Sequence, residues 1–223
     1  AGKLHTGLRC AFLAAVAGTL RWSWVALRHV EVCSDDGRHC LPFAGPIQFS
    51  TFTRWCWMLQ GAYYLVALAA GAWPRLDRAS HVLFEMALAF ALFVTAITYG
   101  VLVPSALLRP QPPHRRGAIE LLLSPPGHIM HSLNTVFILT DLALSPDPGR
   151  VCKGDVVYGM AFGVAYVLFE WAFHSATGLW HYPFMDYDRR LAEASYLALF
   201  GAFALSWRAA AAACGPLARL KGQ

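Results

Sequence analysis

This sequence is poor in charged residues: only 14% of its 223 residues are Asp, Glu, Lys or Arg, whereas 57% are hydrophobic. Soluble globular domains are typically about 25% charged and about 45–50% apolar. The shortage of charge therefore argues against a soluble domain, and the high apolar content excludes a disordered chain. We expect an integral membrane protein that forms a single domain over residues 1–223.

Several chemical signatures are also missing. There is no Cys-x-x-Cys motif, and six cysteines are too few for a disulfide scaffold. The absence of a Gly-x-Ser-x-Gly sequence excludes the nucleophile elbow of an α/β-hydrolase. No nucleic-acid motif accompanies the net charge of +5, which basic residues flanking membrane helices explain more simply. We therefore expect no nucleic-acid partner.

The chain does contain a series of long apolar runs separated by turn-forming segments. A membrane-spanning helix needs about 20 predominantly apolar residues. The pattern predicts an all-α, polytopic membrane bundle of about six transmembrane helices, with a short interfacial helix at 119–123. The predicted spans cover residues 8–27, 49–73, 82–103, 128–144, 156–173 and 192–214. A signal peptide is the alternative for the first run, but its hydrophobic pattern continues through Leu27, which favours a retained span.

Basic residues outside these runs indicate the orientation. With both termini on one side, nine basic residues lie on that side and seven on the other, which slightly favours cytosolic termini. The first group is Lys3, Arg9, Arg75, Arg78, Arg150, Lys153, Arg208, Arg219 and Lys221, and the second is Arg28, Arg38, Arg109, Arg115, Arg116, Arg189 and Arg190. Cys33 and Cys40 bracket a polar loop on the lumenal side, where an oxidising compartment permits a disulfide. The endoplasmic reticulum and the plasma membrane both fit this arrangement.

Polar residues inside the apolar runs are informative because burying them in lipid is costly. Helical spacing places them on one face of each of three predicted helices. These faces carry Thr53, Gln60 and Tyr64 in the second run, His128, His131, Asn134 and Asp141 in the fourth, and Tyr166, Glu170 and His174 in the fifth. We expect the three faces to turn toward a shared interior cavity. The alternative is a non-enzymatic interaction or scaffold protein, in which these side chains only hold helices together.

The histidines allow two chemical interpretations. His128 and His131, with His174 and His181 elsewhere, would suit a metal or haem site. However, neither a thiolate nor a dense carboxylate cluster accompanies them. In the other interpretation, a histidine removes the proton of a hydroxyl nucleophile, because the pKa of imidazole lies near the working pH. Spacing alone does not decide between the two.

Three segments resemble, in order and spacing, segments of a known membrane protein family. The first is Phe-Thr-Arg-Trp at residues 52–55 with Leu-Gln at 59–60, and the second is His-Ile-Met-His at 128–131. The third and most specific is Thr-Gly-Leu-Trp-His-Tyr-Pro-Phe-Met-Asp at 177–186. Together they resemble the androgen-induced and androgen-dependent transmembrane protein family, with agreement from about Phe49 to Asp186.

The resemblance implies an intramembrane hydrolase that cleaves fatty acid esters of hydroxy fatty acids, with a threonine nucleophile, a histidine base and no cofactor or metal. By position, the nucleophile is Thr53 and the base is His131. Thr51 is the alternative nucleophile, although only Thr53 lies seven residues before Gln60, as in the family signature. The substrate would be a membrane lipid that enters from the bilayer. Departures from the family pattern follow the nucleophile, at Arg54, Trp55 and Trp57.

Supporting roles fall to other polar residues of the predicted helices. We expect Asn134 or Asp141 to orient the His131 ring. Asn134, Gln60 or a tryptophan indole N–H would stabilise the oxyanion. His128, near the end of its helix, would line a path for water.

The third segment has two interpretations of its own. Pro183 cannot continue a helix and fixes a turn, which leaves Trp180, Tyr182 and Phe184 to pack at the membrane interface. Alternatively, Trp180 or His181 lines the substrate pocket.

Overall fold

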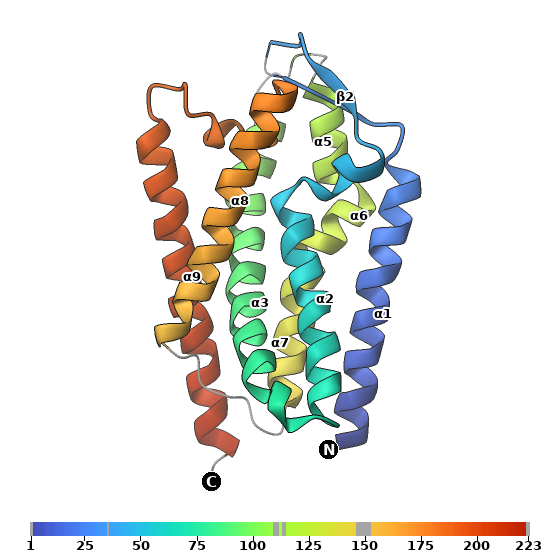
Figure 1. Cartoon of the computed structure of the whole chain (residues 1–223), viewed down its shortest axis with the longest axis vertical. Helices are drawn as coiled ribbons and strands as arrows, with labels where there is room; N and C mark the ends of the chain where they lie inside the picture. Colours follow the sequence, from blue (N-terminus) through green and yellow to red (C-terminus); the bar gives the residue numbers. More distant parts are fainter. Residues whose placement is uncertain (1, 35, 109–111, 113–114, 146–152, 222–223) are drawn as a thin grey trace.

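The computed structural model describes residues 2–34, 36–108, 112, 115–145 and 153–221, with side chains up to Gly215 except that of Lys153. These residues form a bundle of long helices with one small hairpin (Figure 1). The helices are α1 (Gly2–Ala26), α2 (Phe52–Ala70), α3 (Asp77–Ile97), α4 (Val103–Leu108), α5 (Arg116–Leu123), α6 (Pro125–His128), α7 (Asn134–Leu144), α8 (Val156–Thr177) and α9 (Ala192–Lys221). The expected helical class is confirmed.

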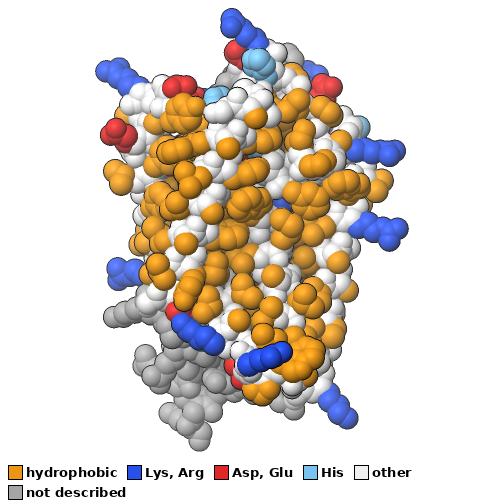
Figure 2. All heavy atoms as spheres, in the orientation of Figure 1, with side chains coloured by type: hydrophobic (Ala, Val, Ile, Leu, Met, Phe, Trp, Pro, Cys, Tyr) orange, Lys and Arg blue, Asp and Glu red, His pale blue; other side chains and the backbone are white. Residues whose placement is uncertain are grey.

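Three stretches of the described chain are long and apolar enough to cross a membrane. They are Pro74–Leu108, Val156–Thr177 and Ala192–Gly215, which correspond to the third, fifth and sixth predicted runs. Figure 2 shows hydrophobic side chains over most of the face between the two ends of the bundle. These features support a membrane protein, whereas six spans stay a prediction.

The other three runs are helical but contain polar interruptions. Helix α1 carries His5, Arg9 and Arg21 within its 25 residues. The fourth run is divided, because the π-helical turn Ile129–Leu133 separates α6 from α7, which has only 11 residues. Length and composition alone therefore do not mark these helices as spans.

The third run extends further than the sequence predicts. We expected it to end at Val103, before Pro104, but α3 continues through a π-helical turn (Thr98–Leu102) into α4. Proline has no N–H group for the helical hydrogen-bond ladder. The wider turn, which ends at Leu102 two residues before Pro104, lets the helix continue past the proline ring.

Helix α3 is the centre of the bundle. It packs against α2, α7, α8 and α9, and α1 packs against α2 and α7. The two chain ends lie at the same end of the bundle, which we call the terminal end (Figure 1). Of the basic residues used to orient the chain, Arg109 and Arg150 lie outside the described residues, and the side chains of Lys153, Arg219 and Lys221 are not described.

The opposite end, which we call the hairpin end, carries the hairpin and α5 (Figure 1). Strand β1 (Glu31–Cys33) pairs antiparallel with β2 (Cys40–Pro42), and a disulfide joins Cys33 to Cys40. Helix α5 covers the predicted interfacial segment and packs against β1. The disulfide that the sequence permits is thus formed in the structure.

Aromatic and polar contacts hold the first turn of α2 in place. The Phe52 ring contacts the rings of Phe90, Phe93, Phe162 and Tyr166, which lie on α3 and α8. The Arg54 guanidinium donates from Nη1 to Gln48 Oε1 at 2.8 Å and lies over the Phe43 ring. The start of α2 is therefore fixed against three neighbouring elements, and any group on its first turn is held rigidly.

Candidate functional site

Thr53 and His131, the nucleophile and base implied by the resemblance, lie in direct contact. Thr53 belongs to the first turn of α2, and His131 belongs to the π-helical turn between α6 and α7. Thr53 Oγ1 lies 3.1 Å from His131 Nε2. This separation is within the hydrogen-bond reach that a general base requires. Single π-helical turns occur frequently at functional sites, and this one carries the histidine.

Among the described residues, no orienting group contacts the second ring nitrogen of His131. His131 is only 8% exposed, and its Nδ1 atom has no hydrogen-bond partner among the described residues. For Nε2 to accept a proton from Thr53, Nδ1 must carry the ring hydrogen. In a catalytic triad a carboxylate fixes that tautomer. The Thr53–His131 pair is therefore a dyad.

Gln60 and Asn134 lie deeper in the bundle and link two helices. Gln60 Nε2 donates to the Asn134 carbonyl oxygen and to the Tyr64 hydroxyl, both at 3.0 Å. Asn134 Oδ1 accepts from the Thr135 N–H at 2.6 Å. In the part of the chain described, no hydrogen bond joins either side chain to Thr53 or to the His131 ring. The two residues therefore form a structural contact between α2 and α7, and Asn134 does not orient the His131 ring as expected. Their expected role in stabilising the oxyanion stays a prediction.

Asp141 lies at the terminal end, away from His131. It accepts from Arg9 Nε at 2.8 Å, contacts His5 Nε2 at 2.8 Å, and accepts from the Tyr63 hydroxyl. Ten residues along a helix correspond to about 15 Å. The expectation that Asp141 orients His131 is therefore corrected: this buried carboxylate joins α1, α2 and α7.

Tyr182 is a site residue that the sequence interpretation missed. Gly178, with φ of 72°, ends α8 in the left-handed conformation, and the following chain turns back toward α2. The Tyr182 hydroxyl lies next to Thr53, near enough for the side chain and backbone of Thr53 to influence its pKa. Burial and the nearby Glu170 charge raise the pKa of Tyr182 above its ordinary value, so its hydroxyl keeps its proton at neutral pH. The sequence motif that contains Tyr182 predicts only packing at the membrane interface for this residue.

An apolar cavity lies beside Thr53. It has a volume of about 80 Å³ between α2, α3, α8 and α9, and its wall is almost entirely hydrocarbon. The phenylalanines of that wall are Phe52, Phe90, Phe93, Phe184, Phe200 and Phe203. A wall of this composition suits a hydrocarbon chain.

A second pocket of about 100 Å³ lies on the other side of Thr53, toward the hairpin end. We call it the hairpin-end pocket, and its wall includes Thr51, Arg54, His131 and His181. Thr53, Leu102 and Tyr182 line both spaces. Thr53 therefore lies where an apolar cavity meets a pocket with polar and charged groups.

The other expected site residues are Thr51, His128 and Trp180, and the structure places them in different surroundings. Thr51 is the N-cap residue of α2 and lines the hairpin-end pocket. His128 is exposed, and its Nδ1 atom lies 3.0 Å from the Tyr99 hydroxyl. Trp180 stacks on His174 with ring centroids 4.0 Å apart and lines neither of the two spaces at Thr53.

The three polar faces do not converge on one cavity. The start of α2 meets His131, His181 and Glu170 at the hairpin end, Gln60 meets Asn134 in the middle, and Asp141 meets α1 at the terminal end. The expected shared cavity is thus replaced by three contact levels inside the bundle, of which the first borders the two spaces described above.

The histidines weighed for a metal or haem site are not gathered in one place. Among the described residues, His81, Glu85 and Asp155 are the group whose potential ligand atoms lie within 4.8 Å of one another. His128, His131, His174 and His181 are not part of it and contact different partners. The arrangement offers no support for a four-histidine site.

No protein-family model, curated protein or solved structure matches this chain. The family resemblance therefore rests on the three sequence segments, and the activity that it implies stays a proposal.

Proposed function

We propose that this chain is an intramembrane hydrolase of lipid esters, with Thr53 as the nucleophile and His131 as the general base. The observation that carries the proposal is the 3.1 Å contact between Thr53 Oγ1 and His131 Nε2, at the boundary of the apolar cavity and the hairpin-end pocket. A threonine hydroxyl is a weak nucleophile until a neighbouring base takes its proton. His131 is the neighbouring base.

The proposed reaction has two stages. Thr53 Oγ1 attacks the ester carbonyl carbon while His131 Nε2 takes the hydroxyl proton. The carbon–oxygen bond to the alcohol then breaks, and the alcohol leaves with that proton. Water hydrolyses the threonyl ester by the same route and releases the acid. The Tyr182 hydroxyl, which contacts Thr53, is our candidate donor to the negatively charged oxygen of the intermediate.

The two spaces at Thr53 support an ester with two long arms. The fatty acyl chain would fill the apolar cavity, where aromatic rings exclude water. The alcohol part of the ester would then extend into the hairpin-end pocket. This division fits the substrate class that the resemblance implies, the fatty acid esters of hydroxy fatty acids.

Arg54 supports a substrate with a free carboxylate. It lines the hairpin-end pocket, is only 2% exposed, and its Nη2 atom has no hydrogen-bond partner among the described residues. A buried charge without a counter-ion is costly. A guanidinium group is well suited to bind a carboxylate with two parallel hydrogen bonds. A hydroxy fatty acid ester carries such a carboxylate at the end of its alcohol part.

In this proposal all six apolar runs span the membrane. The termini face the cytosol, and the hairpin end faces the lumen or the outside. Two observations support the arrangement: the chain ends lie at the same end of the bundle, as an even number of spans requires, and the Cys33–Cys40 disulfide lies at the other end. The endoplasmic reticulum and the plasma membrane both remain compatible locations.

The test is hydrolysis of a fatty acid ester of a hydroxy fatty acid by the purified chain in detergent micelles. Thr53→Ala is compared with Thr51→Ala, a matched control two residues earlier that lines the same pocket. We expect Thr53→Ala to lower turnover at least about 100-fold for an ester whose acyl chain fills the apolar cavity, because that cavity borders Thr53 and the covalent route through Thr53 is lost. Thr51→Ala should keep most of the activity.

Two outcomes would contradict the proposal. Activity that survives Thr53→Ala and disappears in Thr51→Ala would move the nucleophile to Thr51. If the wild-type chain hydrolyses none of a panel of such esters, the buried polar groups are left with a structural role only, which favours the non-enzymatic scaffold interpretation.

A further inference from the structure

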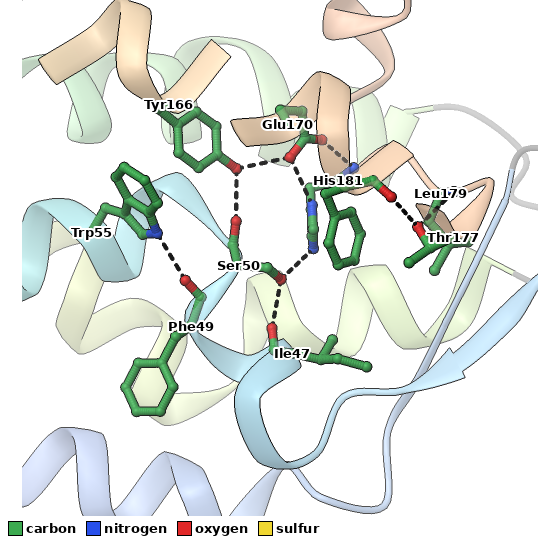
Figure 3. Close-up of polar contacts among 10 residues, drawn as sticks. Ile47, Phe49, Ser50, Trp55, Tyr166, Glu170, Thr177, Leu179 and His181 are labelled. Atoms are coloured by element: carbon green, nitrogen blue, oxygen red, sulfur yellow. Dashed lines mark hydrogen bonds and ion pairs between the residues drawn. The ribbon is translucent and has the colours of Figure 1, made fainter. Parts of the chain in front are cut away.

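A second hydroxyl lies against a second histidine at the start of α2 (Figure 3). Ser50 Oγ is 2.7 Å from His181 Nε2, and His181 Nδ1 is 2.9 Å from Glu170 Oε2. Ser50 directly precedes Thr51, the N-cap of α2, whereas Glu170 lies on α8 and His181 follows that helix. The order of hydroxyl, Nε2, Nδ1 and carboxylate is the order found in catalytic triads.

The carboxylate of this trio is held by additional hydrogen bonds. Glu170 is fully buried, and its Oε1 atom accepts from the His181 backbone N–H at 2.8 Å. The Tyr166 hydroxyl lies 3.2 Å from Glu170 Oε2 and 3.0 Å from the Ser50 carbonyl oxygen, as Figure 3 shows. A carboxylate held in this way favours the histidine tautomer with hydrogen on Nδ1. His181 Nε2 is then free to accept a proton from Ser50.

The two histidines that contact hydroxyl groups at the start of α2 therefore differ. His131 contacts Thr53 but has no partner at Nδ1 among the described residues, whereas both ring nitrogens of His181 have partners. By the criterion that a base needs an orienting group, Ser50 is better activated than Thr53.

The position of the trio also matters, because a buried network of this kind can simply attach the loop after α8 to α2. His181 lines the hairpin-end pocket, and so do Thr51 and Thr53 on either side of Ser50. Ser50 itself is only 3% exposed. The two sequence neighbours of Ser50 and its histidine partner therefore lie on the pocket wall, while Ser50 itself is buried next to them.

We propose that Ser50, His181 and Glu170 form a second nucleophilic site, which takes the acyl group of a carboxylic ester bound in the hairpin-end pocket. Ser50 Oγ adds to the carbonyl carbon as His181 Nε2 takes the hydroxyl proton. The bond to the alcohol breaks, the alcohol leaves with the proton, and water later releases the acid from Ser50 by the same route. Glu170 is a positioning residue, since it acts through His181. This inference does not depend on the role of Thr53.

One competing contact must be exchanged before reaction. The Ser50 hydroxyl also lies 2.5 Å from the Ile47 carbonyl oxygen, and its single hydrogen serves only one acceptor at a time. Rotation of the hydroxyl about the Cβ–Oγ bond points that hydrogen at His181 Nε2 instead, which is 2.7 Å from Ser50 Oγ.

The experiment uses an alkyl fluorophosphonate, which phosphonylates activated hydroxyl groups, on the full chain in detergent micelles. Fragmentation mass spectrometry of the peptide that contains both residues identifies the modified one. We expect an adduct on Ser50 in the wild type and also in Thr53→Ala. Glu170→Gln, which keeps the size of the side chain, should slow formation of the Ser50 adduct at least about 100-fold.

Tyr166→Phe is the matched control, because it removes one contact of Glu170 and leaves the His181–Glu170 contact. If the network is only structural, both variants lower the melting temperature and neither selectively slows the Ser50 adduct. Absence of a Ser50 adduct in the wild type overturns this proposal even if Glu170→Gln does not fold. An adduct on Thr53 alone also overturns it, and that result leaves the Thr53 hydrolase proposal standing.

Discussion

Two buried polar clusters in this bundle differ in how completely their hydrogen-bonding groups are paired. In the Asp141 cluster, the carboxylate contacts His5, Arg9 and Tyr63, so its charge is compensated within the protein. Around Thr53, two buried polar atoms have no hydrogen-bond partner in the part of the chain that the structure describes: His131 Nδ1 and Arg54 Nη2. A fully satisfied buried network makes a structure rigid. Unsatisfied buried groups cost stability and are therefore more informative about function.

Both clusters produce the same signal in the sequence, a polar residue within an apolar run. Asp141 and His131 even lie on one predicted helix face, and both were candidates for the active site. Only the side chains that they contact in the structure distinguish Asp141 from His131. The difference predicts that changes in the Asp141 cluster act on stability, whereas changes around Thr53 act on turnover or substrate binding.

The largest expected effect is on turnover in His131→Ala. Removing a general base typically costs about 10²- to 10⁴-fold in rate. His128→Ala is the matched control, since His128 lies three residues earlier and contacts Tyr99 instead of Thr53. Ester hydrolysis and the melting temperature are measured for both. Equal turnover in the two variants would remove His131 from the proposed mechanism.

Asp141→Asn is expected to lower the stability of the protein and to leave its turnover unchanged. Loss of the carboxylate charge leaves the Arg9 guanidinium without its counter-ion, and breaking a buried ion pair costs about 3–5 kcal/mol. Partial exposure of Arg9 places the expected loss at about 3 kcal/mol, the lower end of that range. Denaturant unfolding measures it, with Thr140→Ala on the same helix as a control. Turnover per folded molecule should stay near that of the wild type, and a selective loss of turnover would break the distinction between the clusters.

The sequence predicted the helical class and, through the resemblance, the two residues that the structure brings within 3.1 Å. Helical periodicity tells which residues share a face, but it does not tell which neighbour meets that face or at what depth. Asp141 was therefore grouped with His131. Tyr182 reaches the site through the turn at Gly178, and the partner of Ser50 comes from the same loop, so neither contact has a periodic signal.

Helix ends were predicted less well than helix positions for a related reason. Apolar content marks where lipid would surround a helix, whereas hydrogen bonding decides where the helix stops. Helix α1 begins at Gly2 although the first run was placed at 8–27, and α9 continues to Lys221 although the last run was placed at 192–214.

A smaller effect, on substrate binding, is expected for Arg54→Gln. A hydrogen bond to a charged group contributes about 1.5–3 kcal/mol, so KM for an ester with a free carboxylate should rise at least about 10-fold. The methyl ester of the same substrate, which lacks that charge, should show little change. Because Arg54 has no acidic partner among the described residues, the variant should not lose the stability that Asp141→Asn loses. An equal rise in KM for both esters would contradict a carboxylate-binding role.

The smallest expected effect concerns the pH dependence of stability at the Arg78–Asp155 pair, which is compensated like the Asp141 cluster but more exposed. The hydrogen bond from Arg78 holds the pKa of the Asp155 carboxyl below its ordinary value. A carboxyl whose pKa is lowered by folding stabilises the protein above its unfolded pKa, and that stability is lost as pH falls through the folded pKa. Since the Arg78 side chain is 60% exposed, we expect at most about 1 kcal/mol. Between pH 6 and pH 3, the melting temperature should therefore fall slightly more in the wild type than in Arg78→Gln. The difference between the two proteins should develop as the pH falls below the pKa of free aspartate, which is about 3.9. An identical fall in both proteins would show that the pair contributes nothing to acid stability, and would confine strong electrostatic stabilisation in this bundle to fully buried clusters such as that of Asp141.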